Sequence, residues 1–200
     1  MVPAIIPEGR TERLILKPLA LEDAPQIQRL FAQWSVVKYL AAKVPWPYPA
    51  DGADQFIRSS ALPAMAAGAA WHWTLRLSAD PEQIIGAISL ILGEDENRGF
   101  WLAPEHRGHG YMSEACAWTS DFWFDTLGQP LLRAPKAIAN EGSRRISERM
   151  GMRVVNLELR DYVSGRLPSE IWEITAEEWH AWKKKHTASL RSRSSTSRSR

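Results

Sequence analysis

The chain has 200 residues, 44% of them hydrophobic, which is typical of one globular domain with a substantial core. Its apolar runs are shorter than the roughly 18 residues that span a bilayer, and its single cysteine, Cys116, excludes an internal disulfide framework. The net charge is +2, but taking away the four arginines of residues 187–200 leaves 21 basic residues against 23 acidic ones. We therefore expect a cytoplasmic domain over residues 1–186, with no secretory signal and no membrane partner.

Residues 187–200 form a low-complexity segment rich in arginine and serine. Such a composition predicts a disordered tail. A nucleic-acid-binding arm is a possible function for this tail, but a solvated appendage is favoured because the rest of the chain is near neutral.

Hydrophobic spacing predicts the elements of the first third in this order: a strand at 13–19, a helix at 21–31, a short helix at 36–40, a loop at 45–49 and a helix at 51–67. The loop is required because Pro-Trp-Pro-Tyr-Pro fits neither a helix nor a central strand. Asp23 is the expected N-cap of the first helix, and Pro63 is expected to interrupt the third.

The remaining elements follow the same patterns: strands at 71–77, 84–92 and 98–103, a helix at 112–126, a strand at 133–139, a helix at 143–150, hairpin strands at 153–162 and 170–175, and a helix at 176–185. Gly151 is the expected stop of the helix at 143–150. Strands mixed with helices, without an internal repeat, predict an α/β (α+β) domain with a central sheet.

The most informative segment is the strand–turn–helix over residues 99–115, in which Gly108 and Gly110 bracket the turn. Glycines let the backbone approach a ligand closely, and the free N–H groups that open a helix favour an anion. The segment therefore predicts a phosphate or pyrophosphate site. It is not a P-loop, because no lysine follows Gly110, and it lacks the third glycine of the dinucleotide fingerprint.

The loop Glu105-His-Arg-Gly-His-Gly110 resembles the acyl-CoA pyrophosphate loop of the GNAT superfamily of N-acetyltransferases, although Glu105 stands where the superfamily usually has Gln or Arg. The chain is similar to the ribosomal-protein-alanine/serine N-acetyltransferase subgroup in four further places: Thr11 to Leu19 with Glu22 to Ala24, Pro47-Tyr48 with Asp54 to Ile57, Gly99 to Pro104, and Asn140 to Ser143 with Ile146 and Arg149 to Met152. The resemblance implies a GNAT-like mixed, mostly antiparallel sheet with a splayed mid-sheet strand and flanking helices.

The resemblance implies transfer of an acetyl group from acetyl-CoA, without a metal, to a primary amine through a tetrahedral intermediate. A backbone N–H of the splayed strand, over Trp101, Leu102 and Ala103, would hold the thioester carbonyl, with Leu102 as the catalytic donor. The other cofactor contacts that it implies are Arg107, Gly108, His109, Gly110, Tyr111, Met112, Asn140 and Ser143.

Several of these residues have two possible roles. The resemblance makes Ser143 the proton donor to the leaving CoA thiolate, but serine also favours a helix N-cap. Asn140 would contact the pantetheine arm or an ordered water, or cap a loop. Arg107 could pair with a phosphate, although the loop amides matter more than its side chain. The general base is open among Glu94, Asp95, Glu96, Glu158 and Asp161.

The free energy needed to deprotonate the attacking amine narrows the choice of acceptor. Near pH 7 a lysine amine costs roughly 4–5 kcal/mol to neutralise, whereas an α-amino group costs about 1–1.5 kcal/mol. A protein N-terminal amine is therefore favoured, with Trp46 and Tyr48 lining its pocket. The alternatives are a small-molecule (antibiotic or polyamine-type) N-acetyltransferase and a non-catalytic acyl-CoA-binding sensor; a nucleic-acid partner is not expected, and the chain would be a monomer or a homodimer.

Overall fold

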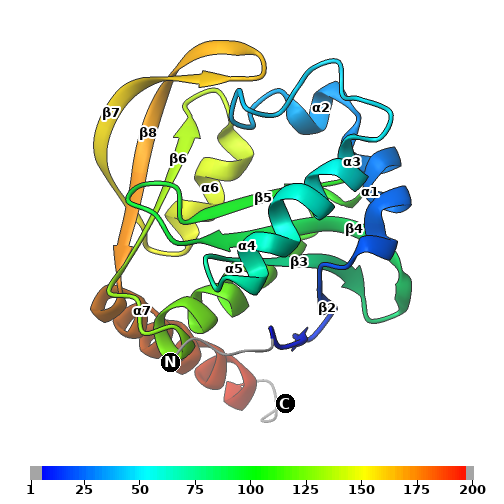
Figure 1. Ribbon diagram of the computed structural model, residues 1–200. Coiled ribbons are helices and arrows are strands. Elements are labelled where there is room, and N and C mark those ends of the chain that lie inside the picture. The colour runs from blue at the N-terminus through cyan, green and yellow to red at the C-terminus, as the bar shows by residue number, and fades with distance from the viewer. Residues whose placement is uncertain (1–5, 197–200) are drawn as a thin grey trace.

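The computed structural model describes residues 6–196, with side chains through His186. Two antiparallel sheets form its centre (Figure 1). The five-stranded sheet has the order β1 (Gly9–Arg10), β2 (Leu14–Pro18), β3 (Ala70–Leu77), β4 (Asp80–Ile91) and β5 (Arg98–Leu102). The three-stranded sheet has the order β6 (Leu131–Ala137), β8 (Gly165–Thr175) and β7 (Arg153–Tyr162).

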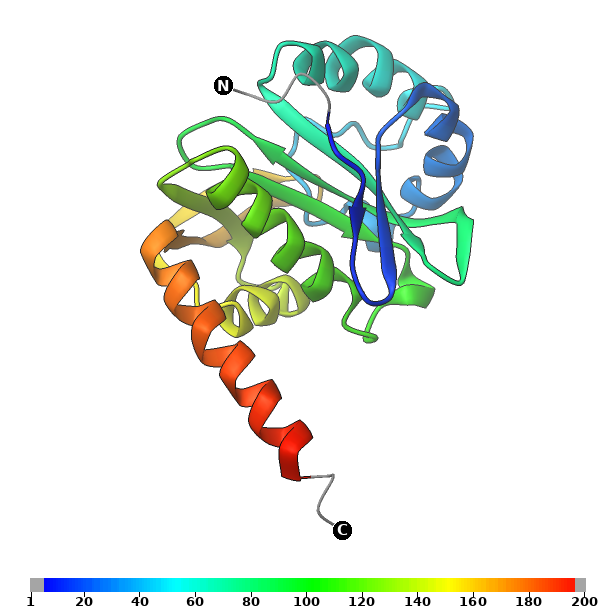
Figure 2. The same ribbon diagram turned by 90° about the horizontal axis from the view of Figure 1, so that it is seen from below.

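Helices cover both faces of the larger sheet (Figure 2). One face carries α1 (Ala24–Phe31), α2 (Trp34–Val37), α3 (Gly52–Phe56) and α4 (Leu62–Ala66), and the other side of the molecule carries α5 (Tyr111–Asp121), α6 (Glu141–Arg149) and α7 (Ala176–Thr196). Two separate hydrophobic clusters of buried residues correspond to these two layers. The fold is therefore the mixed α/β arrangement, with mostly antiparallel strands and flanking helices, that the sequence predicts.

Strand β3 shows how the pattern divides between the two layers. Trp71, Trp73 and Leu75 belong to the cluster under α5, where the Trp73 ring centroid lies 5.3 Å from that of Phe122. His72 points to the opposite face, and its ring centroid lies 5.9 Å from that of Phe56 at the end of α3. Alternation along one strand thus serves two cores, as expected for a strand covered on both faces.

The two sheets meet where β5 and β6 begin, and Asn97 joins them there. Its backbone N–H donates to the Arg133 carbonyl at 2.8 Å, and its side-chain Oδ1 accepts from the Arg133 N–H at 2.7 Å. Beyond this point each strand pairs only with its antiparallel neighbour, β4 or β8, within residues 6–196. The central strands therefore start together and then separate, which is the splayed strand implied by the resemblance.

Two expectations about the helices need correction. Residues 52–66 are helical without a break, because a π-helical turn over Ile57–Ala61 precedes Pro63. We attribute the continuity to that wider turn, since an internal proline otherwise clashes with the carbonyl four residues earlier. Asp23 precedes α1 but its side chain does not cap it. Its carboxylate instead accepts from the Ala20 N–H at 3.0 Å and pairs with buried Arg76 at 2.6 Å.

Three boundaries also differ from the predicted ones by four residues or more. Strand β4 begins at Asp80 and strand β8 at Gly165, each earlier than expected, because the turns that join them to their partners are tight. Helix α7 continues to Thr196, so residues 187–196 have a helical backbone where a disordered tail was expected. Residues 197–200 of that tail lie outside the described residues.

Candidate functional site

The opening between β5 and β6 is a cavity of about 730 Å³. The lining comes from the segment from α2 to Leu40, the end of β5, the glycine loop with the start of α5, residues 139–140 and helix α6. Figure 1 shows where these elements lie. Nine of the eleven residues expected at the cofactor line it, namely Trp101, Leu102, Arg107, Gly108, Gly110, Tyr111, Met112, Asn140 and Ser143. Ala103 and His109 do not.

The glycine loop presents its backbone to this cavity. Gly108 and Gly110 have φ of 84° and 83°, the left-handed region that glycine adopts without strain. The first helical bond of α5 runs from the Glu114 N–H to the Gly110 carbonyl, at 3.1 Å. Within residues 6–196, the backbone N–H groups of residues 108–113 donate to no protein acceptor. A run of vacant donors at a helix N-terminus is a site for an anion.

Side chains behind the loop fix its position. The Arg13 guanidinium donates to the His109 carbonyl at 3.0 Å and lies 4.8 Å from the Tyr111 ring centroid. Glu114 accepts from the Arg13 backbone at 2.9 Å and side chain at 2.8 Å, and also from the Thr11 hydroxyl. Burial alone would raise the pKa of Glu114, but these hydrogen bonds outweigh it and lower the pKa below its ordinary value.

Arg107 has a structural role that differs from the expected phosphate contact. Its Nε donates to the Leu102 carbonyl at 3.1 Å and its Nη2 to the Ser35 carbonyl at 3.0 Å. The guanidinium is therefore turned toward β5 and α2, and it ties the glycine loop to both. Burial lowers the pKa of Arg107, an effect that Glu105 partly offsets.

Pairing with β4 decides which backbone groups of β5 face the cavity. The Ala103 N–H donates to the Ile85 carbonyl at 2.9 Å, so the expectation that it is available to a ligand is wrong. Trp101 is two residues earlier and in register with Ala87, so its N–H points the same way. Leu102 faces oppositely, and its carbonyl is the one that Arg107 binds. Of the three expected donors, the Leu102 N–H is the one directed into the opening.

Helix α6 starts at the cavity and is capped by a side chain. The Asn140 Oδ1 accepts from the Ser143 N–H at 3.4 Å, so Asn140 is the N-cap and Ser143 is not. The Ser143 hydroxyl is half-buried, lines the cavity and accepts from the Lys136 Nζ at 2.9 Å.

Lys136 is a functional-site candidate that the sequence reasoning missed. Burial, assisted by the charge of Arg98, lowers its pKa to about 7. A signal was present, because Leu132, Ala134 and Lys136 follow one another at strand spacing and all three are buried. A lysine in phase with core residues is rare unless it is paired or functional.

The cavity is basic. Its charged lining residues are Lys38, Arg107, Glu141, Arg145 and Arg149. Within the described residues Glu141 is the single carboxylate of the lining, and it pairs with Arg145 at 2.9 Å. This charge balance suits a polyanionic ligand.

None of the five acids considered as general base lines the cavity formed by the described residues. Asp95 pairs with Arg133 at 3.1 Å, whereas Glu96 and Glu158 both pair with Arg160. Asp95, Glu96 and Glu158 therefore take part in ion pairs in or next to the smaller sheet.

The two aromatic residues expected at the acceptor do not line the cavity formed by the described residues. The Tyr48 ring packs on Phe31, with 5.0 Å between centroids, and burial raises the pKa of its hydroxyl. Trp46 is 42% exposed and lies against Trp34, whose ring centroid is 5.4 Å away. Trp34 directly precedes the cavity residues Ser35 and Val36, so this aromatic pair lies near the rim of the cavity.

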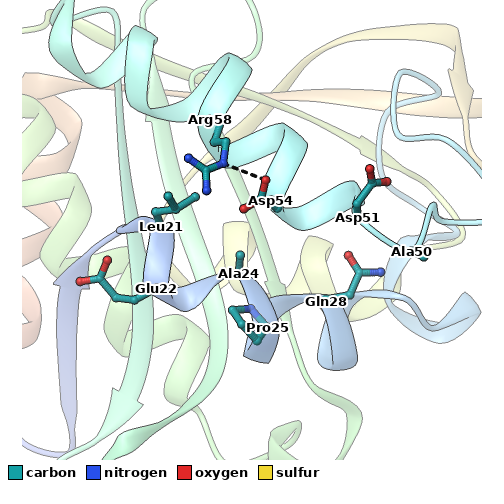
Figure 3. Close-up of a pocket in the computed structure, with 9 residues that line it drawn as sticks. All are labelled: Leu21, Glu22, Ala24, Pro25, Gln28, Ala50, Asp51, Asp54 and Arg58. Atoms are coloured by element: carbon teal, nitrogen blue, oxygen red, sulfur yellow. Dashed lines mark hydrogen bonds and ion pairs between the residues drawn. The ribbon is translucent and has the colours of Figure 1, made fainter.

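A second cavity of about 630 Å³ lies between α1 and α3 and shares no lining residue with the first (Figure 3). Its acids are Glu22, just before α1, and Asp51 and Asp54 at the start of α3, where Asp54 pairs with Arg58 at 2.9 Å. None of its lining residues within residues 6–196 is a glycine.

The part of the chain that the structure describes holds no group of three or more metal-ligating side chains. In the same part, no helix is long and apolar enough to cross a bilayer. Cys116 is buried in α5, and burial raises its pKa.

Comparisons with known proteins show which proteins this chain is similar to. The uncharacterized N-acetyltransferase YoaA of Bacillus subtilis strain 168 is 27% identical over 167 residues, which cover 80% of this chain and 89% of that protein. The ribosomal-protein-S5-alanine acetyltransferase of Vibrio fischeri has a TM-score of 0.74 at 15% identity, over 87% of this chain and 99% of that one. RimL, a ribosomal L7/L12 α-N-protein acetyltransferase solved with coenzyme A, has a TM-score of 0.70 at 13% identity, over 87% and 97%.

The acetyltransferase (GNAT) domain family matches residues 13–153, which include the glycine loop, both diverging strands and the start of α6. With this match, the chain belongs to the acetyltransferase (GNAT) domain family and is an acetyl-CoA-dependent N-acetyltransferase.

Proposed function

We propose that this acetyltransferase modifies the N-terminal α-amino group of a protein, with acetyl-CoA held in the cavity between β5 and β6. The vacant N–H groups of residues 108–113 support binding of its diphosphate. The basic lining is consistent with the other phosphate of the cofactor. A volume of about 730 Å³ suits the pantetheine arm and part of the nucleotide.

The end of β5 would activate the thioester. The Leu102 N–H, directed into the opening, donates to the carbonyl oxygen as that oxygen gains negative charge. A preorganised donor of this kind typically contributes about 3–4 kcal/mol to a transition state. Ser143, on the facing helix, donates its hydroxyl proton to the departing sulfur.

The observation that carries the choice of acceptor is the scarcity of bases. Among the described residues the cavity has one carboxylate, Glu141, and Arg145 already binds it. A site without a strong base is suited to an amine that is partly neutral near pH 7. An α-amino group, with a pKa of about 7.7–8.0, meets this condition, whereas a lysine amine at about 10.4 does not.

The acceptor would approach from the side of α2. There the Trp34–Trp46 pair is exposed, and the tip of the β7–β8 hairpin closes the rim through the bonds from Val163 N–H to Leu40 carbonyl and from Ser164 N–H to Lys38 carbonyl. Two exposed indoles provide a rigid apolar contact for the first side chains of a peptide. Tyr48, which packs on Phe31, is not part of this surface.

Release of the CoA thiol, measured with three classes of acceptor, tests the proposal. The first class is peptides with a free α-amino group and no lysine, the second is the same peptides acetylated at the N-terminus and carrying one lysine, and the third is small amines, including a polyamine and an aminoglycoside. We expect turnover with the first class to exceed the second by at least about tenfold, from the difference in neutral amine. Faster turnover with the third class would replace the protein acceptor with a small molecule.

Binding of CoA in a calorimeter without turnover of any acceptor would instead favour a sensor. A cytoplasmic location and a monomeric or homodimeric state belong to the same proposal. Fractionation and light scattering of the purified protein test them.

A further inference from the structure

Two buried cations lie in the region where the central strands separate. Arg98 on β5 and Lys136 on β6 are 5% and 4% exposed, and neither forms an ion pair with a carboxylate of the described residues. Arg98 donates to the Ser120 hydroxyl at 3.1 Å and to the Met152 sulfur at 3.2 Å, and its Nε has no partner within residues 6–196. Unpaired buried cations are costly, so their retention calls for a function.

The surroundings of Lys136 leave its ammonium group one hydrogen-bond partner among the described residues. From β5, the Phe100 ring centroid lies 5.0 Å from Nζ, and the Arg98 guanidinium acts on Nζ through its charge. From α5, the neighbouring group is the Cys116 thiol, which burial keeps neutral. From α6, the Ser143 hydroxyl accepts from Nζ at 2.9 Å.

Glu170 on β8 is the cross-strand neighbour of Lys136, but its carboxylate is already bound. It accepts from Arg144 at 2.7 and 2.8 Å and from the Trp172 indole at 2.9 Å. The hydrogen bond of Lys136 is therefore directed to Ser143 alone.

The protonation state of this lysine determines the direction of the Ser143 hydroxyl. An ammonium group only donates, so Ser143 Oγ must accept from it and its own O–H is left to donate elsewhere. Because Ser143 lines the cavity, that proton is available to a ligand there. A neutral amine, in contrast, can accept, and the hydroxyl proton then turns inward toward Nζ.

We propose that Lys136 is a positioning residue for acetyl transfer, which as a cation directs the Ser143 proton into the cavity and replaces that proton once it has been given away. The inference rests on the proposed role of Ser143. As the amine nitrogen bonds to the acetyl carbon and the carbon–sulfur bond breaks, the electron pair stays on sulfur and sulfur takes the Ser143 proton. Ser143 then takes a proton from Lys136. The acetylated nitrogen loses one proton to water, and Lys136 regains one from water.

The pair makes turnover depend on pH in the neutral range. Burial and the charge of Arg98 lower the pKa of Lys136 to about 7 in the free protein, so the cationic form is lost as pH rises through this region. The α-amino acceptor becomes neutral over a similar range and favours turnover at higher pH. Lys136 therefore contributes a descending alkaline limb to the kcat profile.

The test compares kcat and the KM for acetyl-CoA over about pH 6–9 in the native protein and in three single variants, Lys136→Met, Lys136→Arg and Ser143→Ala. Lys136→Met keeps the length of the side chain and removes the charge, so it is expected to fold. We expect kcat to fall roughly tenfold in Lys136→Met and about 100-fold in Ser143→Ala, with little change in KM. Lys136→Arg should keep more activity than Lys136→Met. Its kcat should no longer fall at alkaline pH, because a guanidinium stays charged.

A double variant and a control complete the design. Lys136→Met added to Ser143→Ala should lower kcat no further, because the lysine acts through the hydroxyl. Lys17→Met removes an exposed lysine on β2 and should leave the pH profile unchanged. Full activity in Ser143→Ala would overturn the proposed proton donor itself. A loss in Ser143→Ala with a native profile in Lys136→Met would leave the donor in place and overturn the role of Lys136.

Discussion

Helices α5 and α6 both begin at the same cavity, but their N-termini are built differently. Helix α5 starts at Gly110 without a side-chain cap, and its first N–H groups are vacant within the described residues. Helix α6 starts at Asn140, whose side chain binds the Ser143 N–H. The first terminus therefore offers backbone donors to a ligand, whereas the second uses its cap to hold a side chain, the Ser143 hydroxyl, at the cavity.

The side chains that hold the two helix N-termini in place also differ. Arg13 and Glu114 hold the glycine loop from its outer side, by contacts with backbone and by one ion pair at 2.7 Å. Lys136 supports α6 from the buried side. Substitutions at the α5 terminus should thus change cofactor binding, and substitutions at the α6 terminus should change the chemical step.

The largest effect is expected from Gly108→Ala. Both this change and the control Gly128→Ala place a Cβ at positive φ, 84° and 63°, with no atom within 4 Å of either Cβ. Each should lose roughly 1–2 kcal/mol of stability from the left-handed backbone. Only Gly108 faces the cavity, so only Gly108→Ala should weaken CoA binding, by about 10- to 100-fold, in a calorimetric titration. Equal affinities of the two variants would show that the loop is not the diphosphate site.

The second effect is the pH dependence of stability that Lys136 produces. Its pKa is about 7 when folded, below that of an unfolded lysine, so above this value the unfolded chain binds more protons and stability rises with pH. Between about pH 7 and pH 9 the native protein should gain about 2 kcal/mol relative to Lys136→Met. Urea titrations measure the difference, and Lys17→Met should show none. Parallel curves for all three proteins would mean that Lys136 stays protonated in the fold up to pH 9, with a pKa close to that of an unfolded lysine.

The sequence revealed the α5 terminus much better than the α6 terminus, for a physical reason. Gly108 and Gly110 are local signals, because a positive φ and a close backbone approach select glycine directly. Strand spacing places Lys136 in phase with Leu132 and Ala134, but its hydrogen bond to Ser143 is recognisable only when β6 is paired with β8 and covered by α6. Which of Leu102 and Ala103 faces the cavity depends on the register of β5 against β4.

The separation of the sheets was likewise implied by resemblance and not by pattern. Asn97, which joins the two sheets by two bonds to Arg133, falls in a stretch that reads only as an acidic turn. Local sequence patterns therefore did not predict the contacts between residues that are distant in sequence. They include the Trp34–Trp46 pair and the hydrogen bond from Arg107 to the Ser35 carbonyl in α2.

The third effect concerns the cap that holds Ser143. Asn140→Ala removes the acceptor for the Ser143 N–H and should cost about 1 kcal/mol of stability, whereas Asn140→Asp keeps an acceptor and should cost less. If the cap positions the hydroxyl, kcat should fall in the alanine variant and recover in the aspartate variant, with the KM for acetyl-CoA nearly constant. Thermal melts and initial rates provide both readouts. A rise in KM without loss of kcat would make Asn140 a cofactor contact instead.

The smallest effect is expected on the outer support of the glycine loop. Glu114→Gln removes the charge that Arg13 pairs with, in a partly exposed position, so we expect a loss of about 0.5–1 kcal/mol in urea unfolding. Arg13 would then hold the His109 carbonyl less firmly, and CoA should bind a few-fold more weakly with kcat unchanged. Glu148→Gln, an exposed change on α6, is the matched control. A fall in kcat at constant affinity would show that the two termini are coupled, and the division between a binding end and a chemical end would no longer hold.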